Sequence, residues 1–220
     1  MFKIAAEVDS SIFHPLIELL QKQPIPVNKY RKSSGVGRSQ VFGICRQRNG
    51  SYTGSRWNFV RPEVFDEIVR IGNRILPTGF SYQAIQLNMN YETEGHTDKG
   101  NRGESAIVGF GDYEKGELVV NATEVDIKNK VILFDGSKWV HWTKPFTGTR
   151  FSLVYHTVDR DFKEVPVFSF VMDEKGKPML REDLEGSTRL YSRDGRVTFS
   201  SNGVYPVVRP QQPTLRACVE

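Results

Sequence analysis

The peptide YQAIQLNMN, residues 82–90, alternates two kinds of side chain along its whole length. Successive side chains of an extended chain point to opposite faces of a sheet. We therefore expect two sets of residues, one on each face: Tyr82, Ala84, Gln86, Asn88 and Asn90, and Gln83, Ile85, Leu87 and Met89. This alternation predicts a β-strand with one polar face.

Further short β runs follow this strand, separated by turn residues: SAIVGFG (105–111), GELVV (116–120), VDI (125–127), KVILF (130–134) and RFSLVYHTV (150–158). Two amphipathic helices are expected before it, at residues 10–23 and from Pro62 to about Leu76, because apolar side chains recur there at helical spacing. Pro77 and Gly79 end the second helix. A strand-like run at 40–46 lies between the helices.

Several closely spaced strands after two helices predict a mainly β, α+β domain, a barrel or sandwich buttressed by the N-terminal helices. Beyond about Val165, two hairpins are expected, with turns at Glu174–Gly176 and Asp194–Gly195. We interpret residues 1–220 as one domain in three parts: helical and basic support (1–80), a catalytic β core (81–160), and extra strands with an extended tail (161–220).

The composition is that of a soluble globular protein, with 38% hydrophobic and 25% charged residues in 220. No stretch approaches the roughly 18 apolar residues that a membrane-spanning helix needs. The N-terminus lacks the pattern of a secretory signal, and the two cysteines, Cys45 and Cys218, are too few for a disulfide framework. We expect an intracellular protein with reduced thiols and no membrane association. The compartment and the oligomeric state stay open.

The net charge is only +4, but residues 28–61 contain no acidic residue. This basic segment carries eight cations: Lys29, Arg31, Lys32, Arg38, Arg46, Arg48, Arg56 and Arg61. Aromatic residues are interleaved with them: Tyr30, Phe42, Tyr52, Trp57 and Phe59. Cations with aromatics suit a nucleic acid partner, and Arg38 is expected among the substrate contacts. The alternative is a solvated basic surface whose aromatics belong to the core.

The tripeptide His96-Thr97-Asp98 indicates a metal site. In an extended chain the side chains of residues i and i+2 point the same way, so the imidazole and the carboxylate converge. His141, which follows the strand KVILF and a turn, is the natural third ligand. Two histidines and one carboxylate on one face of a metal are typical of non-heme Fe(II) oxygenases, whose open positions accept a 2-oxo acid and O2.

Arg150 meets a second requirement of such chemistry. 2-Oxoglutarate has a distal carboxylate, and burying that charge without a partner is costly. Arg150 and Ser152 share one face of the strand 150–158. A guanidinium beside a hydroxyl is a good arrangement for holding a carboxylate. Taken singly, each of these residues also fits a structural role, so the prediction rests on their conjunction.

The chain resembles the 2-oxoglutarate/Fe(II) dioxygenase superfamily over about residues 80–158, through HTD, GEL, His141 and R-x-S. The resemblance implies a double-stranded β-helix, or distorted jelly roll. HTDKGN (96–101), SAIVGFGDYEKGEL (105–118), FDG (134–136) and PFTGTRFSLVYHT (145–157) look closest to the TET and J-binding-protein branch, which oxidises the 5-methyl group of pyrimidines in nucleic acid. Two features depart from that branch: EKGEL replaces the usual GGEL, and the Cys/His cluster of the animal enzymes is absent from the sequence.

The resemblance also implies roles for polar residues near the metal. Asn88 would contact 2-oxoglutarate or a nearby water. Asn101 would meet the target base, since an amide can pair with a nucleobase edge. Asn90 and Tyr91 would line the substrate side. Ordinary strand and loop polarity is the alternative for each of them.

Three hypotheses follow from the sequence. The first is an enzyme that uses Fe(II), 2-oxoglutarate and O2, with ascorbate as a stimulant, to hydroxylate a pyrimidine 5-methyl group, releasing succinate and CO2. The second keeps this chemistry but acts on a protein side chain, as a prolyl hydroxylase does, or on a small molecule. The third is a binding module that has lost turnover. DNA versus RNA, strandedness and the extent of oxidation are left open.

Overall fold

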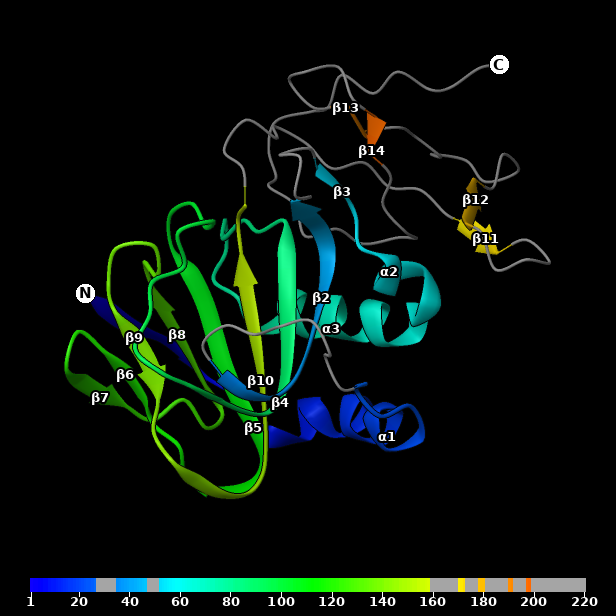
Figure 1. Cartoon of the computed structure of the whole chain (residues 1–220). Helices are drawn as coiled ribbons and strands as arrows, with labels where there is room; N and C mark the ends of the chain where they lie inside the picture. Colours follow the sequence, from blue (N-terminus) through cyan, green and yellow to red (C-terminus); the bar gives the residue numbers. More distant parts are fainter. Residues whose placement is uncertain are drawn as a thin grey trace.

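The predicted strand is β4 (Ala84–Thr93), an inner strand of the large sheet of the computed structural model (Figure 1). The structure describes residues 1–26, 35–46 and 52–158, and four short strands between residues 170 and 198. Neighbours in the sheet are antiparallel, in the order β1 (Phe2–Glu7), β8 (Lys130–Phe134), β5 (Ser105–Lys115), β10 (Phe146–His156), β4, β2 (Gly35–Arg46) and β3 (Tyr52–Gly54).

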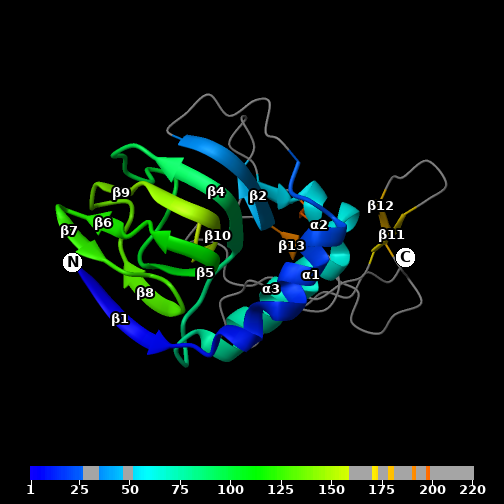
Figure 2. The ribbon, with the colours of Figure 1, turned by 90° about the horizontal axis from the view of Figure 1, so that it is seen from below.

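A smaller antiparallel sheet contains β7 (Thr123–Val125), β6 (Leu118–Val120) and β9 (His141–Thr143). It faces the large sheet on the side away from the helices (Figure 2). An apolar cluster joins the two sheets, with Leu118 and Val120 from the small one and Ile132 and Phe134 from the large one. Two facing antiparallel sheets with helices on the outside are the double-stranded β-helix expected from the sequence.

Helices cover the other face of the large sheet (Figure 2). The first predicted helix is a 3-10 turn, η1 (Ser10–Phe13), continued by α1 (His14–Lys22), and Asp9 caps its start by accepting from the N–H of Ser11. The second is α3 (Pro62–Ile75), preceded by the short α2 (Arg56–Val60). The apolar faces of α1 and α3 and of the large sheet form the main hydrophobic core: Phe13, Leu16, Phe65, Ile68, Leu87, Leu153 and Tyr155 are among its buried residues.

Several elements differ from the sequence prediction. Strands β1, β3 and β9 and helix α2 were not predicted, and β2 begins at Gly35 and not near residue 40. The expected strand over VDI is wrong by two residues, since β7 ends at Val125. Asp126 instead accepts a hydrogen bond from the N–H of Lys128 at 2.8 Å and shapes the following turn. Such side-chain bonds to nearby backbone compete with sheet pairing.

Both hairpins expected after residue 165 are present as strand pairs. β11 (Phe170–Met172) pairs with β12 (Pro178–Leu180), and β13 (Leu190–Tyr191) pairs with β14 (Val197–Thr198). Their turns lie outside the described residues, and the assignment of 1–220 to one domain stays a prediction. None of the helices among the described residues has the length and apolar character needed to cross a membrane.

Candidate metal centre and its cavity

The structure brings His96, Asp98 and His141 together at the edge of the small sheet. His96 forms an isolated bridge with His141, which opens β9, and the two residues exchange backbone hydrogen bonds of 3.1 and 2.9 Å. Their rings lie side by side, with centroids 4.4 Å apart. One ligand atom from each of the three residues lies within 4.8 Å of the others. Backbone pairing between His96 and His141 therefore brings two of the three side chains close enough to bind one metal ion.

Backbone and side-chain contacts orient each ligand. Nδ1 of His96 contacts the carbonyl of Glu94 at 2.7 Å, and Nδ1 of His141 contacts the carbonyl of Trp139 at 3.0 Å. A carbonyl can only accept, so in the neutral imidazoles Nδ1 carries the proton and Nε2 has the lone pair that a metal would use. The two Nε2 atoms lie 3.7 and 3.5 Å from the carboxylate oxygens of Asp98. Such outer contacts typically fix the ligands of a metal site.

Asp98 is held by its own partners. Its backbone N–H donates to the carbonyl of Gly136 at 2.8 Å, and the side-chain amide of Asn101 donates to Oδ2 at 3.2 Å. A Cβ at Gly136 would lie only 3.2 Å from both Asp98 Oδ2 and His141 Cε1. Glycine at this position therefore leaves space beside the ligands that a larger residue would fill.

The ionisation of Asp98 and His141 is coupled. Burial alone would raise the pKa of Asp98, but the hydrogen bond from His141 and the nearby histidine charges lower it overall. Burial opposes the charge on His141, yet the bond to Asp98 raises its pKa overall. The lowered pKa of Asp98 favours its anionic carboxylate, and the raised pKa of His141 favours retention of a proton on its imidazole. A divalent cation at this point would replace the proton on His141, as expected for a metal site.

These ligands line a cavity of about 510 Å³ between the two sheets. Asn88, Arg150 and Ser152 from the large sheet project into the same space. The walls also include apolar side chains: Val41, Ile107, Leu118, Phe134 and Val154. The cavity therefore holds the three candidate ligands and the predicted carboxylate-binding residues together.

Arg150 is the unusual group in this cavity. It is only 2% exposed, and its guanidinium carbon lies 5.6 and 5.5 Å from the ring centroids of Tyr113 and Phe146. Within the described part of the chain, neither its Nε nor its Nη2 makes a hydrogen bond. Burial lowers the pKa of Arg150, but an arginine side chain stays protonated in proteins. A buried cation with unused donors is costly, and a carboxylate ligand would satisfy both donors.

The turn before β6 makes space for this guanidinium. Gly116 has φ +75°, and a Cβ there would lie 2.9 Å from Phe146 Cβ and 3.2 Å from Arg150 Nε. The preceding Lys115 also has a positive φ, of +65°. A positive φ favours glycine, and position 115 is where the usual GGEL pattern mentioned above has its first glycine. Lys115 is the departure noted in the sequence, and the structure accommodates it in the same backbone conformation.

Of the four other residues predicted to contact 2-oxoglutarate or substrate near the metal, three line the cavity and one does not. Asn88 donates to Ser152 Oγ at 3.1 Å and accepts from Gln86 at 2.8 Å, so it belongs to a polar row on the cavity floor. Asn101 and Tyr91 line the cavity. Asn90 does not: its side chain accepts a hydrogen bond from the backbone N–H of Arg150.

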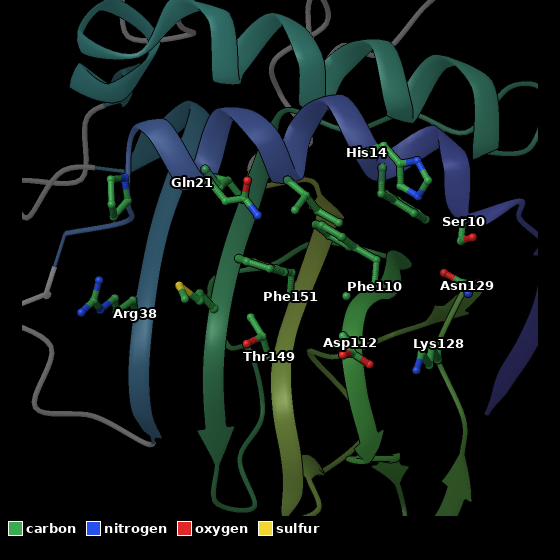
Figure 3. A pocket seen from close by; sticks show the side chains of 16 residues that line it. Ser10, His14, Gln21, Arg38, Phe110, Asp112, Lys128, Asn129, Thr149 and Phe151 are labelled. Atoms are coloured by element: carbon green, nitrogen blue, oxygen red, sulfur yellow. The ribbon is translucent and has the colours of Figure 1, made fainter.

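Arg38 lies on the opposite face of the large sheet, in a second cavity of about 840 Å³ beneath α1 (Figure 3). Its Nη1 donates to the carbonyl of Ile25 at 3.1 Å. Side chains alternate along the strands, so Phe151 and Met89 face α1 while their neighbours Arg150 and Asn88 face the metal ligands. The structure therefore does not bring Arg38 to the candidate metal centre.

The basic segment 28–61 is only partly described, and its described residues have mixed roles. Phe42 is fully buried in the core, and Arg61 is buried and hydrogen-bonded to Gln40 and Gln23. Arg56 is exposed and stacks on Trp57 at 4.7 Å. The side chains of the other members lie outside the described residues: Lys29, Tyr30, Arg31, Lys32, Arg46, Arg48, Tyr52 and Phe59. The alternative of a core aromatic therefore holds for Phe42, whereas Arg61 is a buried, hydrogen-bonded cation and not part of a solvated surface.

Sequence reasoning missed three residues near the site. Gln86 and His156 line the cavity, and Tyr113 packs on Arg150. Burial raises the pKa of Tyr113 to about 12, so its hydroxyl keeps its proton at neutral pH. The alternation along β10, which places residues 150, 152, 154 and 156 on one face, contained the signal for His156. Tyr113 gave no such signal, because its approach to Arg150 depends on the register between β5 and β10, in which Arg150 lies opposite Gly111.

No family model and no curated protein matches the sequence. Among solved structures, the chain is similar to NgTET1 in complex with 5mC DNA, at 15% identity over 69% of each chain with a TM-score of 0.46. A prolyl-4-hydroxylase from Pseudomonas putida matches at 14% identity, covering 70% of this chain and 90% of that one, with a TM-score of 0.44. A 2OG-Fe(II) oxygenase family oxidoreductase from Burkholderia pseudomallei matches at 15%, covering 70% and 84%, with a TM-score of 0.48. Similarity at this level does not identify a substrate or an activity for this chain.

Proposed function

We propose that this chain is an Fe(II)- and 2-oxoglutarate-dependent oxygenase that hydroxylates the 5-methyl group of a pyrimidine in nucleic acid. The observation that carries the proposal is the conjunction in one cavity. His96, Asp98 and His141 are within 4.8 Å of one another, and the buried Arg150 offers two nitrogens without a hydrogen bond among the described residues. The first group fits a divalent metal, and the second fits a carboxylate.

The residues present fit both implied groups. His96, Asp98 and His141 would hold Fe(II) by two imidazoles and one carboxylate, leaving positions free for 2-oxoglutarate and O2. When bound, iron, 2-oxoglutarate and O2 would supply the oxidising chemistry: one oxygen atom of O2 would enter the hydroxylated C–H bond and the other the succinate formed, with CO2, from 2-oxoglutarate. Arg150 would bind the distal carboxylate of 2-oxoglutarate, with Ser152 and Asn88 as neighbouring polar contacts.

The cavity leaves room for a substrate at the end away from Arg150. His156 lies six positions after Arg150 on β10, which corresponds to about 20 Å along a strand. Around His156 the lining includes Gln86 and Asn101, whose amides can donate to and accept from a base edge. About 510 Å³ shared with 2-oxoglutarate admits one base and not a duplex, so a paired base would have to leave the stack.

Charge near this end supports a nucleic acid substrate. Lys99 lines the cavity and is exposed, and Arg102 is exposed next to Asn101. Cations at such a position can contact the phosphates that flank an inserted base. We expect binding to weaken steeply with salt for this reason.

The test is a 2-oxoglutarate turnover screen with Fe(II), ascorbate and O2, in which succinate is measured. Substrates are DNA and RNA with and without 5-methylpyrimidines, peptides, and free nucleosides. We expect succinate release to rise with methylated nucleic acid and to fall as salt increases. Stimulation by peptides or small molecules alone would keep the oxygenase but replace the substrate. Failure to release succinate in every arm would indicate a binding module and contradict the proposal.

A further inference from the structure

An irregularity in β4 lies directly beside Arg150. In the pairing of β10 with β4, Phe151 faces Met89, so the next pair in register would be Arg150 with Asn90. The regular ladder ends at Met89, and Asn90 adopts φ +47°. Instead of a backbone carbonyl, the side-chain Oδ1 of Asn90 accepts the backbone N–H of Arg150 at 2.8 Å. The Asn90 side chain thus completes the pairing of the residue that carries the buried guanidinium.

The neighbouring strand β2 is shaped to fit this irregularity. Val36 faces Glu92 and Arg38 faces Met89, so the single residue Gly37 is opposite both Asn90 and Tyr91. Two residues opposite one define a β-bulge. Gly37 has φ +135°, and a Cβ there would lie 2.2 Å from the carbonyl oxygen of Asn90. The bulge is therefore held from both sides, by an asparagine on β4 and a glycine on β2.

The bulge also shifts which side chains enter the cavity. In an unbroken strand Asn88 and Asn90 would share the cavity face, and Tyr91 would point away. The extra residue in β4 shifts the alternation of faces by one position, so that Tyr91 and Thr93 line the cavity and Asn90 does not. Beyond the bulge, Thr93 Oγ1 accepts the N–H of Thr143 at 3.1 Å, which joins β4 to β9 two residues after the candidate ligand His141.

We infer that Asn90 is a positioning residue for 2-oxoglutarate binding: its side chain fixes the backbone of Arg150 and thereby directs the guanidinium into the cavity. The assignment rests on the proposed function. Asn90 itself is neither a candidate metal ligand nor one of the described residues that line the cavity. Because one backbone hydrogen bond sets the position of Arg150, losing it should change 2-oxoglutarate affinity while leaving the metal site in place.

Two variants separate the hydrogen bond from the backbone conformation. Asn90→Gly tolerates the positive φ but removes the acceptor, whereas Asn90→Asp keeps an acceptor oxygen at the same position. Asn121→Gly is the matched control, since Asn121 also has a positive φ, of +48°, but lies in the exposed turn between β6 and β7. All three are compared with the unmodified chain.

Two measurements are made on each protein. Hydrogen–deuterium exchange of the Arg150 amide, without metal or 2-oxoglutarate, reports the hydrogen bond itself. Calorimetric titration of Mn(II), and then of 2-oxoglutarate into the Mn(II)-loaded protein, reports affinity without turnover. We expect faster exchange and about five- to tenfold weaker 2-oxoglutarate binding in Asn90→Gly, the effect of one hydrogen bond, with Mn(II) affinity unchanged. Asn90→Asp should restore slow exchange, and Asn121→Gly should change neither quantity.

The outcomes distinguish this inference from the proposed function. If the unmodified chain binds 2-oxoglutarate and Asn90→Gly binds it equally well, the positioning role is wrong and the proposed function stands. An equal loss of Mn(II) affinity in Asn90→Gly would also overturn the role, since it would indicate general disruption of the site. If the unmodified chain binds no 2-oxoglutarate, the proposed function fails and the positioning role falls with it.

Discussion

Arg61 and Arg150 are two buried arginines in very different surroundings. Arg61 is 5% exposed and lies between α1, α3 and β2. All three of its nitrogens donate to neutral oxygens of Gln40 and Gln23. Arg150 is 2% exposed, yet its Nε and Nη2 make no hydrogen bond among the described residues. Its nearest described contacts include two aromatic rings.

The difference separates a structural cation from one that fits a ligand. Neither arginine can escape the cost of burial by losing its proton. Around Arg61 the protein supplies the acceptors, so the cluster stabilises the junction of helices and sheet. Around Arg150 the described residues supply no acceptor for Nε and Nη2, and these donors share a cavity with the candidate metal ligands. Groups that are poorly satisfied in the free protein often mark functional sites.

The largest expected effect tests whether the Arg150 region is the functional one. His96→Ala or Asp98→Ala removes a metal ligand and should abolish both Fe(II) binding and succinate release, while the Tm changes little. Metal content and succinate are measured on the purified variants. His14→Ala is the matched control, because His14 is exposed at the start of α1, and it should behave as the unmodified chain. Retained activity in either ligand variant would refute the metal assignment.

The next effect is on cosubstrate affinity. Arg150→Met keeps an apolar side chain of similar length but removes the charge. We expect 2-oxoglutarate binding to the Mn(II)-loaded protein to weaken by about 100-fold, corresponding to roughly 3 kcal/mol for a charged hydrogen-bonded contact. Arg61→Met should leave this affinity nearly unchanged, as measured by calorimetry. Equal losses in the two variants would remove the distinction between the two arginines.

The smallest effect is on stability, and here the order of the two variants should be reversed: Arg61→Met should be the more damaging one. Arg61→Met leaves the oxygens of Gln40 and Gln23 without their donor, at a cost of about 2–3 kcal/mol, or roughly 5–10 °C in Tm. Arg150→Met removes a buried charge that lacks partners, so the Tm of the metal-free protein should stay the same or rise. Thermal unfolding of both variants, without 2-oxoglutarate, provides the measurement. A lower Tm for Arg150→Met would show that its guanidinium is stabilising in the free protein.

Much of the candidate site was predictable because it depends on local spacing. His96 and Asp98 are two residues apart, as are Arg150 and Ser152, and extended backbone places such pairs on one face. The helices α1 and α3 were predictable for a similar reason, since their buried residues recur at helical spacing. His141 was predicted beside Asp98 from its residue type and its place after a strand, and their proximity is confirmed by the geometry.

Other features were not predictable because they depend on partners distant in the sequence. Arg38 looked like a substrate contact from its charge, but strand alternation turns it towards α1. β9 is too short to be recognised locally and exists because it pairs with β6 and His96. The bulge at Asn90 arises from its fit to Gly37 and Arg150, and no property of the peptide YQAIQLNMN alone indicates it.

The sequence by itself was enough to select the candidate metal ligands, the arginine proposed to bind a carboxylate, and the period of the main strands and helices, because these depend on residue type and local spacing. Only the tertiary structure decided which buried arginine is satisfied and which side chains of β4 face the metal. Both depend on register between strands: a shift of one residue, as at the bulge opposite Gly37, exchanges the two faces of a strand.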